Sequence, residues 1–197
     1  SSSSAASDVY KRQVQIMRAF VKKRRLPDPS LYVEVANLDI KQMRSTFTEL
    51  ATLLLGDAKQ AKSFMSKAKL HSMEELEDSW WNLYEKLLST GRAVELSLKI
   101  ELEDFLYHMQ KLIHNKKLST GENLTDDVSI DTAAFDDSQC IGDWCAHFNS
   151  TWKNHKLVGM DIGTDSLVLM VLSNEEFKTA QELAKELLHR IDVAERL

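Results

Sequence analysis

Residues 156–173, KLVGMDIGTDSLVLMVLS, decide the fold of this chain. Over 157–162, apolar side chains recur at every second position, which is the period of a β-strand. Residues 167–172 form an unbroken apolar run that is too short for a free helix and typical of a strand buried on both faces. The polar break at 163–166, led by a glycine, predicts a β-hairpin between the two strands.

A helix is predicted directly after this hairpin. Ser173 can accept from the backbone N–H of Glu176, and the Glu176 side chain can reach back, which is a capping box. Apolar residues then recur at the helical spacing, namely Phe177, Leu183, Ala184, Leu187, Leu188 and Ile191. The predicted unit is therefore strand, hairpin, central strand and capped helix.

Other elements follow from the same patterns. Residues 93–100 show the cleanest alternation in the chain, so we predict a strand with one face in water, beside the hairpin. A weaker alternation at 31–36 suggests a further short strand. Capping patterns or apolar stripes predict helix starts at Asp39, Asp57, Ser72, Leu102 and Ile141.

Length and composition restrict the class of protein. A chain of 197 residues fits one domain, and 43% hydrophobic with 28% charged residues is typical of globular proteins. No apolar run approaches the roughly 20 residues of a membrane span, and no signal peptide is visible. Two cysteines indicate no disulfide framework. We therefore expect a cytoplasmic protein without a membrane partner.

Two segments stand apart from the predicted core. Residues 1–7 are of low complexity, and residues 8–13, DVYKRQ, resemble adapter sequence translated at the ends of assembled metagenomic reading frames. We treat 1–13 as a disordered or non-native tail. Residues 119–138 contain six acids and no base. We therefore predict a single domain over 14–197 with a solvated, mobile acidic loop insertion at 115–138.

Three patterns that could mark ligand sites are assigned to ordinary structure. The four cations at 22–25 could contact nucleic acid, but a basic helix end explains them, and the net charge of −5 disfavours general nucleic-acid binding. Cys140, Cys145, His147 and His155 lack zinc-site spacing, and the acidic loop lacks the pattern of a calcium loop. We predict buried or semi-buried thiols, surface histidines, and no metal or cofactor.

The polar residues of the hairpin are the best candidate for a functional site. Turn chemistry accounts for 163–166, because Asp and Ser side chains accept from nearby backbone N–H groups and Gly163 supplies a positive φ. It does not account for Asp161, which is predicted to lie inside a strand, where Asp is disfavoured.

The candidate binding surface combines hairpin residues with neighbours on other elements. Adjacent helix residues point about 100° apart, so Trp80 is predicted in the core and Trp81 partly exposed. Glu95 lies on the wet face of the strand at 93–100. The candidate binding residues are Asp161, Asp165, Ser166, Glu95 and Trp81; none is predicted to be catalytic.

Four motifs resemble an uncharacterised family of small bacterial domains of unknown function. They are LLLGD at 53–57, SWWNLYEKLLSTGRAVELSL at 79–98, the acidic helix start at 101–105, and MDIGTDSLVLMVL at 160–172. The last is similar to that family's D-x-G-S-D-S-like hairpin, with Thr164 where Ser is usual and Leu167 where an aromatic residue is usual. Ser97-Leu98-Lys99 also stands where the family has Asp-Trp-Lys. The resemblance covers about residues 45–190 and implies a fold but no activity.

The predicted fold is α+β, with a small antiparallel sheet of three or four strands packed against several helices that cover mainly one face. The leading function is a non-catalytic, protein-interaction domain, of the kind seen in immunity or regulatory partners. One alternative is a small hydrolase or metal-dependent enzyme that uses Asp161 and Asp165. The other is nucleic-acid binding by the basic N-terminal helix. The sequence does not indicate the oligomeric state.

Overall fold

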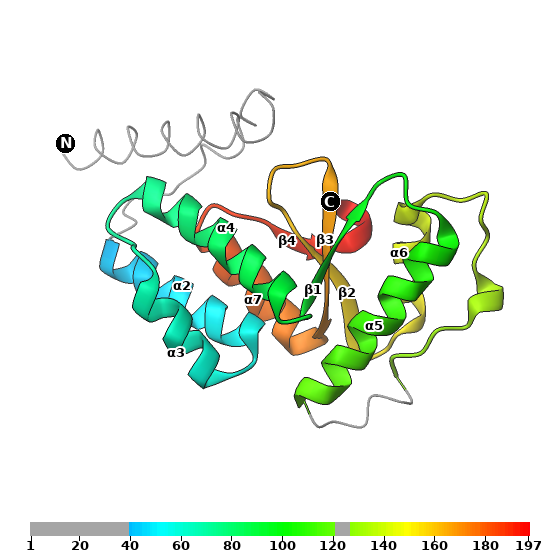
Figure 1. Ribbon diagram of the computed structural model, residues 1–197, viewed down its shortest axis with the longest axis horizontal. Coiled ribbons are helices and arrows are strands. Elements are labelled where there is room, and N and C mark those ends of the chain that lie inside the picture. The colour runs from blue at the N-terminus through cyan, green and yellow to red at the C-terminus, as the bar shows by residue number, and fades with distance from the viewer. Residues whose placement is uncertain (1–39, 121–126) are drawn as a thin grey trace.

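The computed structural model describes residues 40–120 and 127–197. This part of the chain has an α+β fold, with six α-helices and four antiparallel strands (Figure 1). The helices are α2 (Ile40–Leu55), α3 (Ala58–Lys67), α4 (Met73–Ser89), α5 (Leu102–Thr120), α6 (Ile141–Thr151) and α7 (Asn174–Glu186). The strands are β1 (Ala93–Ser97), β2 (His155–Met160), β3 (Ser166–Ser173) and β4 (Ile191–Val193). Short 3-10 helices lie at η3 (Thr132–Ala134) and η4 (Ala194–Arg196).

The predicted hairpin is the centre of the sheet, whose strand order is β1-β3-β2-β4. Strands β2 and β3 pair with Val158 opposite Met170. Strand β1 pairs with the other side of β3, with Glu95 opposite Val168, so the prediction that it lies beside the hairpin is confirmed. Strand β3 therefore has a neighbour on each side.

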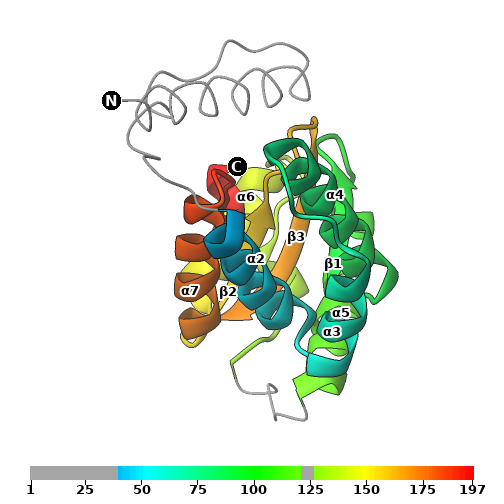
Figure 2. The ribbon, with the colours of Figure 1, turned by 90° about the vertical axis from the view of Figure 1, so that its left-hand side faces the viewer.

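Helices cover both faces of the sheet, so the expectation that they cover mainly one face is wrong. Helices α2, α3, α4 and α7 gather on one side and α5 and α6 on the other (Figure 1). Figure 2 looks onto the first group, with β3 behind it. The cause lies in β3, where Val168, Met170 and Leu172 enter one core and their alternating neighbours enter the other. A strand that is apolar on both faces needs cover on both.

The helix starts follow the predicted capping chemistry. Ser173 accepts from the backbone N–H of Glu176 at 3.1 Å, and Glu176 Oε1 accepts from the Ser173 N–H at 2.8 Å, so this capping box is confirmed. Asp57 caps α3 as predicted. Ser72 caps α4, but the Glu75 carboxylate accepts from the N–H of His71. The cap at Asp39, the strand at 31–36 and the basic run at 22–25 lie outside the described residues.

The end of α7 and the end of β1 both differ from the prediction. Ile191 was predicted on the face of a long helix, but α7 ends at Glu186 and Leu188 turns the chain with φ 60°. Ile191 then begins β4, which pairs with β2. Strand β1 is shorter than 93–100, because the chain turns after Ser97 and the N–H of Ile100 bonds the Ser97 carbonyl at 3.1 Å.

The predicted loop at 115–138 begins later than expected, because α5 continues to Thr120. Its described part, 127–138, is tied to the core at several points. The Trp152 indole donates to the Ser129 carbonyl at 3.2 Å, and Val128 is buried.

In the described part of the chain, no helix is long and apolar enough to cross a membrane.

His155 was predicted at the surface, but it is buried at the start of β2. Its Nδ1 lies 2.6 Å from Asp127 Oδ2. A carboxylate can only accept, so Nδ1 donates this hydrogen bond. The contact links the 127–138 segment to the sheet and gives one of the two buried ring nitrogens a partner.

Candidate functional site

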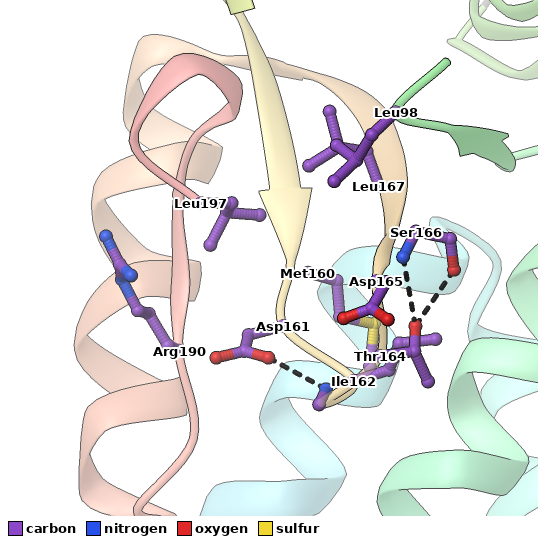
Figure 3. A pocket seen from close by; sticks show the side chains of 11 residues that line it. Leu98, Met160, Asp161, Ile162, Thr164, Asp165, Ser166, Leu167, Arg190 and Leu197 are labelled. Atoms are coloured by element: carbon purple, nitrogen blue, oxygen red, sulfur yellow. Dashed lines mark hydrogen bonds between the residues drawn. The ribbon is translucent and has the colours of Figure 1, made fainter. Parts of the chain in front are cut away.

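The turn end of the hairpin contains a pocket of about 210 Å³ (Figure 3). Its wall comes from the β2–β3 turn, the turn after β1, and the chain on either side of β4. The lining residues are Leu98, Met160, Asp161, Ile162, Gly163, Thr164, Asp165, Ser166, Leu167, Arg190 and Leu197. Two carboxylates and one guanidinium thus share a small cavity with hydroxyl and apolar groups.

Asp161 lies just outside the strand, since β2 ends at Met160. Its Oδ1 accepts from the N–H of Gly163 at 2.8 Å, and Gly163 has a positive φ of 75°. Turn chemistry therefore accounts for Asp161 as well, and the expectation that this residue lacks a structural role is wrong. Its backbone is held on both sides, because its N–H donates to the Arg190 carbonyl at 2.9 Å and its own carbonyl accepts from the Trp80 indole at 3.0 Å.

Asp165 is exposed at the tip of the turn and lines the same pocket as Asp161. Figure 3 shows both carboxylates at the hairpin end, with Arg190 beyond Asp161. Arg190 is held in place through its Nη2, which donates to Asp192 Oδ2 at 3.1 Å and to the Arg196 carbonyl at 2.6 Å. The two carboxylates of the enzyme alternative therefore do line one cavity.

A row of hydrogen-bonded side chains runs from the hairpin across β1 to α4. The Ser166 hydroxyl donates to one oxygen of the Glu95 carboxylate, and the Tyr84 hydroxyl donates to the other. Since Ser166 uses its proton on Glu95, Thr164 is the donor in its 2.8 Å contact with Ser166. Trp81 lies edge-on to Tyr84, with ring centroids 5.5 Å apart.

Tyr84 is the most perturbed group of this row. Burial disfavours its phenolate, and the neighbouring Glu95 carboxylate accepts the hydroxyl proton and repels a second negative charge. Together these effects raise the pKa of Tyr84 to about 12. Tyr84 thus stays a neutral hydrogen-bond donor at physiological pH and holds Glu95 in one orientation.

The five candidate residues fall into two connected groups. Trp81, Glu95 and Ser166 belong to the row, while Asp161 and Asp165 line the pocket, which Ser166 also borders. We call the five residues Trp81, Glu95, Asp161, Asp165 and Ser166 the hairpin surface. Trp80 is buried and Trp81 half-buried, as predicted.

Sequence reasoning missed three contributors to this site. Tyr84 was not among the candidate residues, and Arg190 had no signal because β4 was not predicted. Leu98 falls within the strand predicted over 93–100 but is 52% exposed, since β1 ends before it. The tyrosine could have been found from the helical spacing of three residues that places it beside Trp81.

Cys140, Cys145 and His147 do not line the hairpin pocket, and Cys140 is exposed, so the prediction of a buried or semi-buried thiol is wrong for it. Cys145 lies on α6 and is buried in the core, and burial raises the pKa of its thiol to about 12. His147 packs edge-on against Phe135. Within residues 40–120 and 127–197, no group of three or more His, Cys, Asp or Glu side chains could hold a metal ion.

Comparison with known proteins gives one match. A family model described as a domain of unknown function, DUF6630, matches residues 39–194. This span begins just before α2 and includes β4, so it contains the whole sheet and the hairpin surface. No curated protein and no solved structure matches the chain.

Proposed function

Because the chain belongs to the DUF6630 family of domains of unknown function, we propose its role from the hairpin surface itself. The domain is a non-catalytic protein-interaction domain of the bacterial cytoplasm, and it binds a segment of a partner protein at the hairpin surface. An immunity protein or a regulatory subunit would work in this way.

The observation that carries this proposal is the hydrogen-bonded row. Glu95 is exposed, yet both of its carboxylate oxygens are fixed by the hydroxyls of Tyr84 and Ser166. A carboxylate that is already oriented loses little side-chain entropy when a donor binds it, which is how preorganisation increases affinity. An exposed Glu side chain without such neighbours would lose more side-chain entropy on binding.

Charge and exposure indicate the kind of partner. The hairpin surface carries three carboxylates, from Glu95, Asp161 and Asp165, within a chain of net charge −5. Electrostatic complementarity favours a segment that presents Lys or Arg side chains. The exposed Leu98 beside the pocket and the half-buried Trp81 supply the apolar contacts that interfaces combine with such polar groups.

The test compares quantitative affinity capture from the native host by matched variants. The double substitution Glu95→Gln with Asp165→Asn removes two charges from the hairpin surface without changing side-chain size. The control, Glu182→Gln with Asp137→Asn, removes two exposed charges from α7 and from the 127–138 segment. We expect wild type and control to retain the same stoichiometric protein and the hairpin variant to lose most of it.

Two results would contradict the proposal. One is retention of the same protein by the hairpin variant at wild-type yield. The other is the absence of any stoichiometric protein at low ionic strength, where electrostatic contacts are strongest. Thermal unfolding of each variant shows whether a loss of binding reflects a loss of folding.

A second candidate, a small hydrolase or metal-dependent enzyme, is favoured by one observation. Asp161 and Asp165 line the same pocket, as such a site requires. Calorimetric titration with Mg²⁺ and Mn²⁺ tests it, with Asp161→Asn/Asp165→Asn compared with the same control pair. Saturable binding of the metal ion that only the Asp161/Asp165 variant loses would support the enzyme. If wild type gives no heat beyond that of dilution, the metal-dependent form of this candidate is contradicted.

A further inference from the structure

A buried ionisable pair lies beneath the hairpin surface, between α4 and the segment before β4. Glu77 Oε1 and His189 Nε2 are 2.9 Å apart, and their side chains are only 7% and 2% exposed. The contact is within ion-pair distance but poorly aligned for a hydrogen bond, and neither atom has another hydrogen-bond partner in the described residues. Buried polar groups usually have such partners, so this pair requires an explanation.

The protonation of the ring can be assigned from its other side. His189 Nδ1 lies 2.7 Å from the Leu187 carbonyl, which can only accept, so Nδ1 carries a hydrogen. Nε2 therefore either carries a hydrogen and faces a carboxylate, or lacks one and faces a carboxylic acid. In both states the two side chains together carry no net charge.

This pair is connected to Asp161 by two short routes. Trp80, one helical turn after Glu77, stacks on the His189 ring with centroids 4.1 Å apart, and its indole donates to the Asp161 carbonyl at 3.0 Å. On the other route, Arg190 follows His189 directly, and its carbonyl accepts the Asp161 N–H at 2.9 Å. Both polar groups of the Asp161 backbone are thus bonded to groups next to His189, one stacked on its ring and one in the following residue.

We propose that Glu77 and His189 are positioning residues for the hairpin surface. They fix the Trp80 indole and the Arg190 carbonyl, and these hold the backbone of Asp161 at the point where the pocket begins. The polar pair fixes the orientation of the ring, whereas an apolar contact would let it rotate. That this positioning serves partner binding rests on the function proposed above; the positioning itself does not.

Amide hydrogen exchange of the full chain, followed residue by residue by NMR, tests the proposal. Trp80→Phe keeps an aromatic ring on His189 but removes the donor to Asp161. The matched control is Trp152→Phe, which removes the same kind of buried indole donor, to the Ser129 carbonyl, on the other face of the sheet. The amide of Leu169, in the middle of β3, reports global opening.

We expect Trp80→Phe to speed exchange at Asp161 and Gly163 about tenfold more than at Leu169, as loss of a hydrogen bond to a local turn should. Trp152→Phe should leave that ratio unchanged. Equal acceleration at all three amides in Trp80→Phe would overturn the proposal, because the tryptophan would then be only a core residue.

A second variant covers the case in which Trp80→Phe does not fold. Glu77→Gln preserves volume and replaces the ionisable carboxyl group by a neutral amide. We expect it to shift the Trp80 indole N–H resonance and the Asp161 amide resonance, with unchanged resonances in α5. No shift at Trp80 would overturn the proposal.

The exchange measurement needs no partner, so the two proposals can fail separately. If hydrogen exchange responds to Trp80→Phe as expected but Glu95→Gln/Asp165→Asn does not reduce capture of the partner, the proposed function is refuted and the positioning role stands. If capture is lost as expected but hydrogen exchange does not respond as expected, only the positioning role is refuted.

Discussion

The substitution Asp127→Asn should destabilise the fold strongly, although Asp127 lies at the edge of an acidic segment. Its carboxylate accepts from the backbone N–H groups of Lys153 at 2.9 Å and Asn154 at 3.0 Å, and from His155 Nδ1 at 2.6 Å. Its side chain is 15% exposed. An asparagine offers one oxygen and turns an NH₂ group toward these donors, which leaves at least one of them without an acceptor.

The size of the effect follows from these contacts. Hydrogen bonds to a charged group contribute about 1.5–3 kcal/mol, and a buried donor left without a partner costs about 1–3 kcal/mol. The effects overlap, so we expect a loss of about 2–3 kcal/mol at neutral pH, a sizeable part of the roughly 5–15 kcal/mol by which domains are stable.

The loss should also depend on pH. Burial would raise the pKa of Asp127, but the hydrogen bonds from His155, Asn154 and Lys153 outweigh it and lower the pKa below the ordinary value of 3.8. The folded state therefore binds this proton more weakly than the unfolded state. The stabilisation is complete above about pH 4 and is lost as the pH falls through the lower, folded pKa.

Urea denaturation at neutral and acidic pH measures both quantities. The control is Asp131→Asn in the same segment, where the exposed carboxylate accepts one backbone N–H, from Ala133 at 3.2 Å. It should cost about 1 kcal/mol or less. If Asp127→Asn lies within about 0.5 kcal/mol of wild type at neutral pH, the reasoning about this carboxylate is wrong.

Three further predictions concern the hairpin and the helix that follows it. Ser173→Ala should lower the free energy of unfolding by about 1 kcal/mol through loss of the capping box, measured by urea denaturation; no change would contradict the cap. Gly163→Ala should cost about 1–2 kcal/mol, since the residue has φ 75°, and an equal or higher midpoint of unfolding would contradict the turn geometry. Glu95→Gln should lower the pKa of Tyr84 from about 12 toward its ordinary value of 10.0, followed by ¹³C NMR of the ring; an unchanged value would show that burial alone sets it.

Local chemistry explains why much of the fold could be predicted from sequence. The capping box of Ser173 and Glu176 involves residues three apart, and the glycine of the hairpin acts within a four-residue turn. The apolar run at 167–172 also predicted burial on both faces. The error was to expect helices mainly on one face, because the number of apolar stripes does not say on which side of a sheet each helix packs.

Contacts between distant residues explain what could not be predicted. Strand β4 has three residues, too few for an alternation to stand out, and a left-handed residue, Leu188, ends the helix before it without a glycine. The support of Asp161 comes from Trp80, 81 residues earlier, and from Arg190, which directly precedes the unpredicted strand β4. The Ser166–Glu95 contact spans 71 residues. The register of the sheet and the packing of α4 against it bring these groups together.

The central claim is that the hairpin surface binds a partner protein. The most direct measurement is amide hydrogen exchange of the domain, alone and in complex with the protein that wild type captures. We predict that the partner slows exchange at residues 161–166 and 93–97, with little change in α5 and α6. Protection confined to α5 and α6, or unchanged exchange at residues 161–166, would contradict the claim.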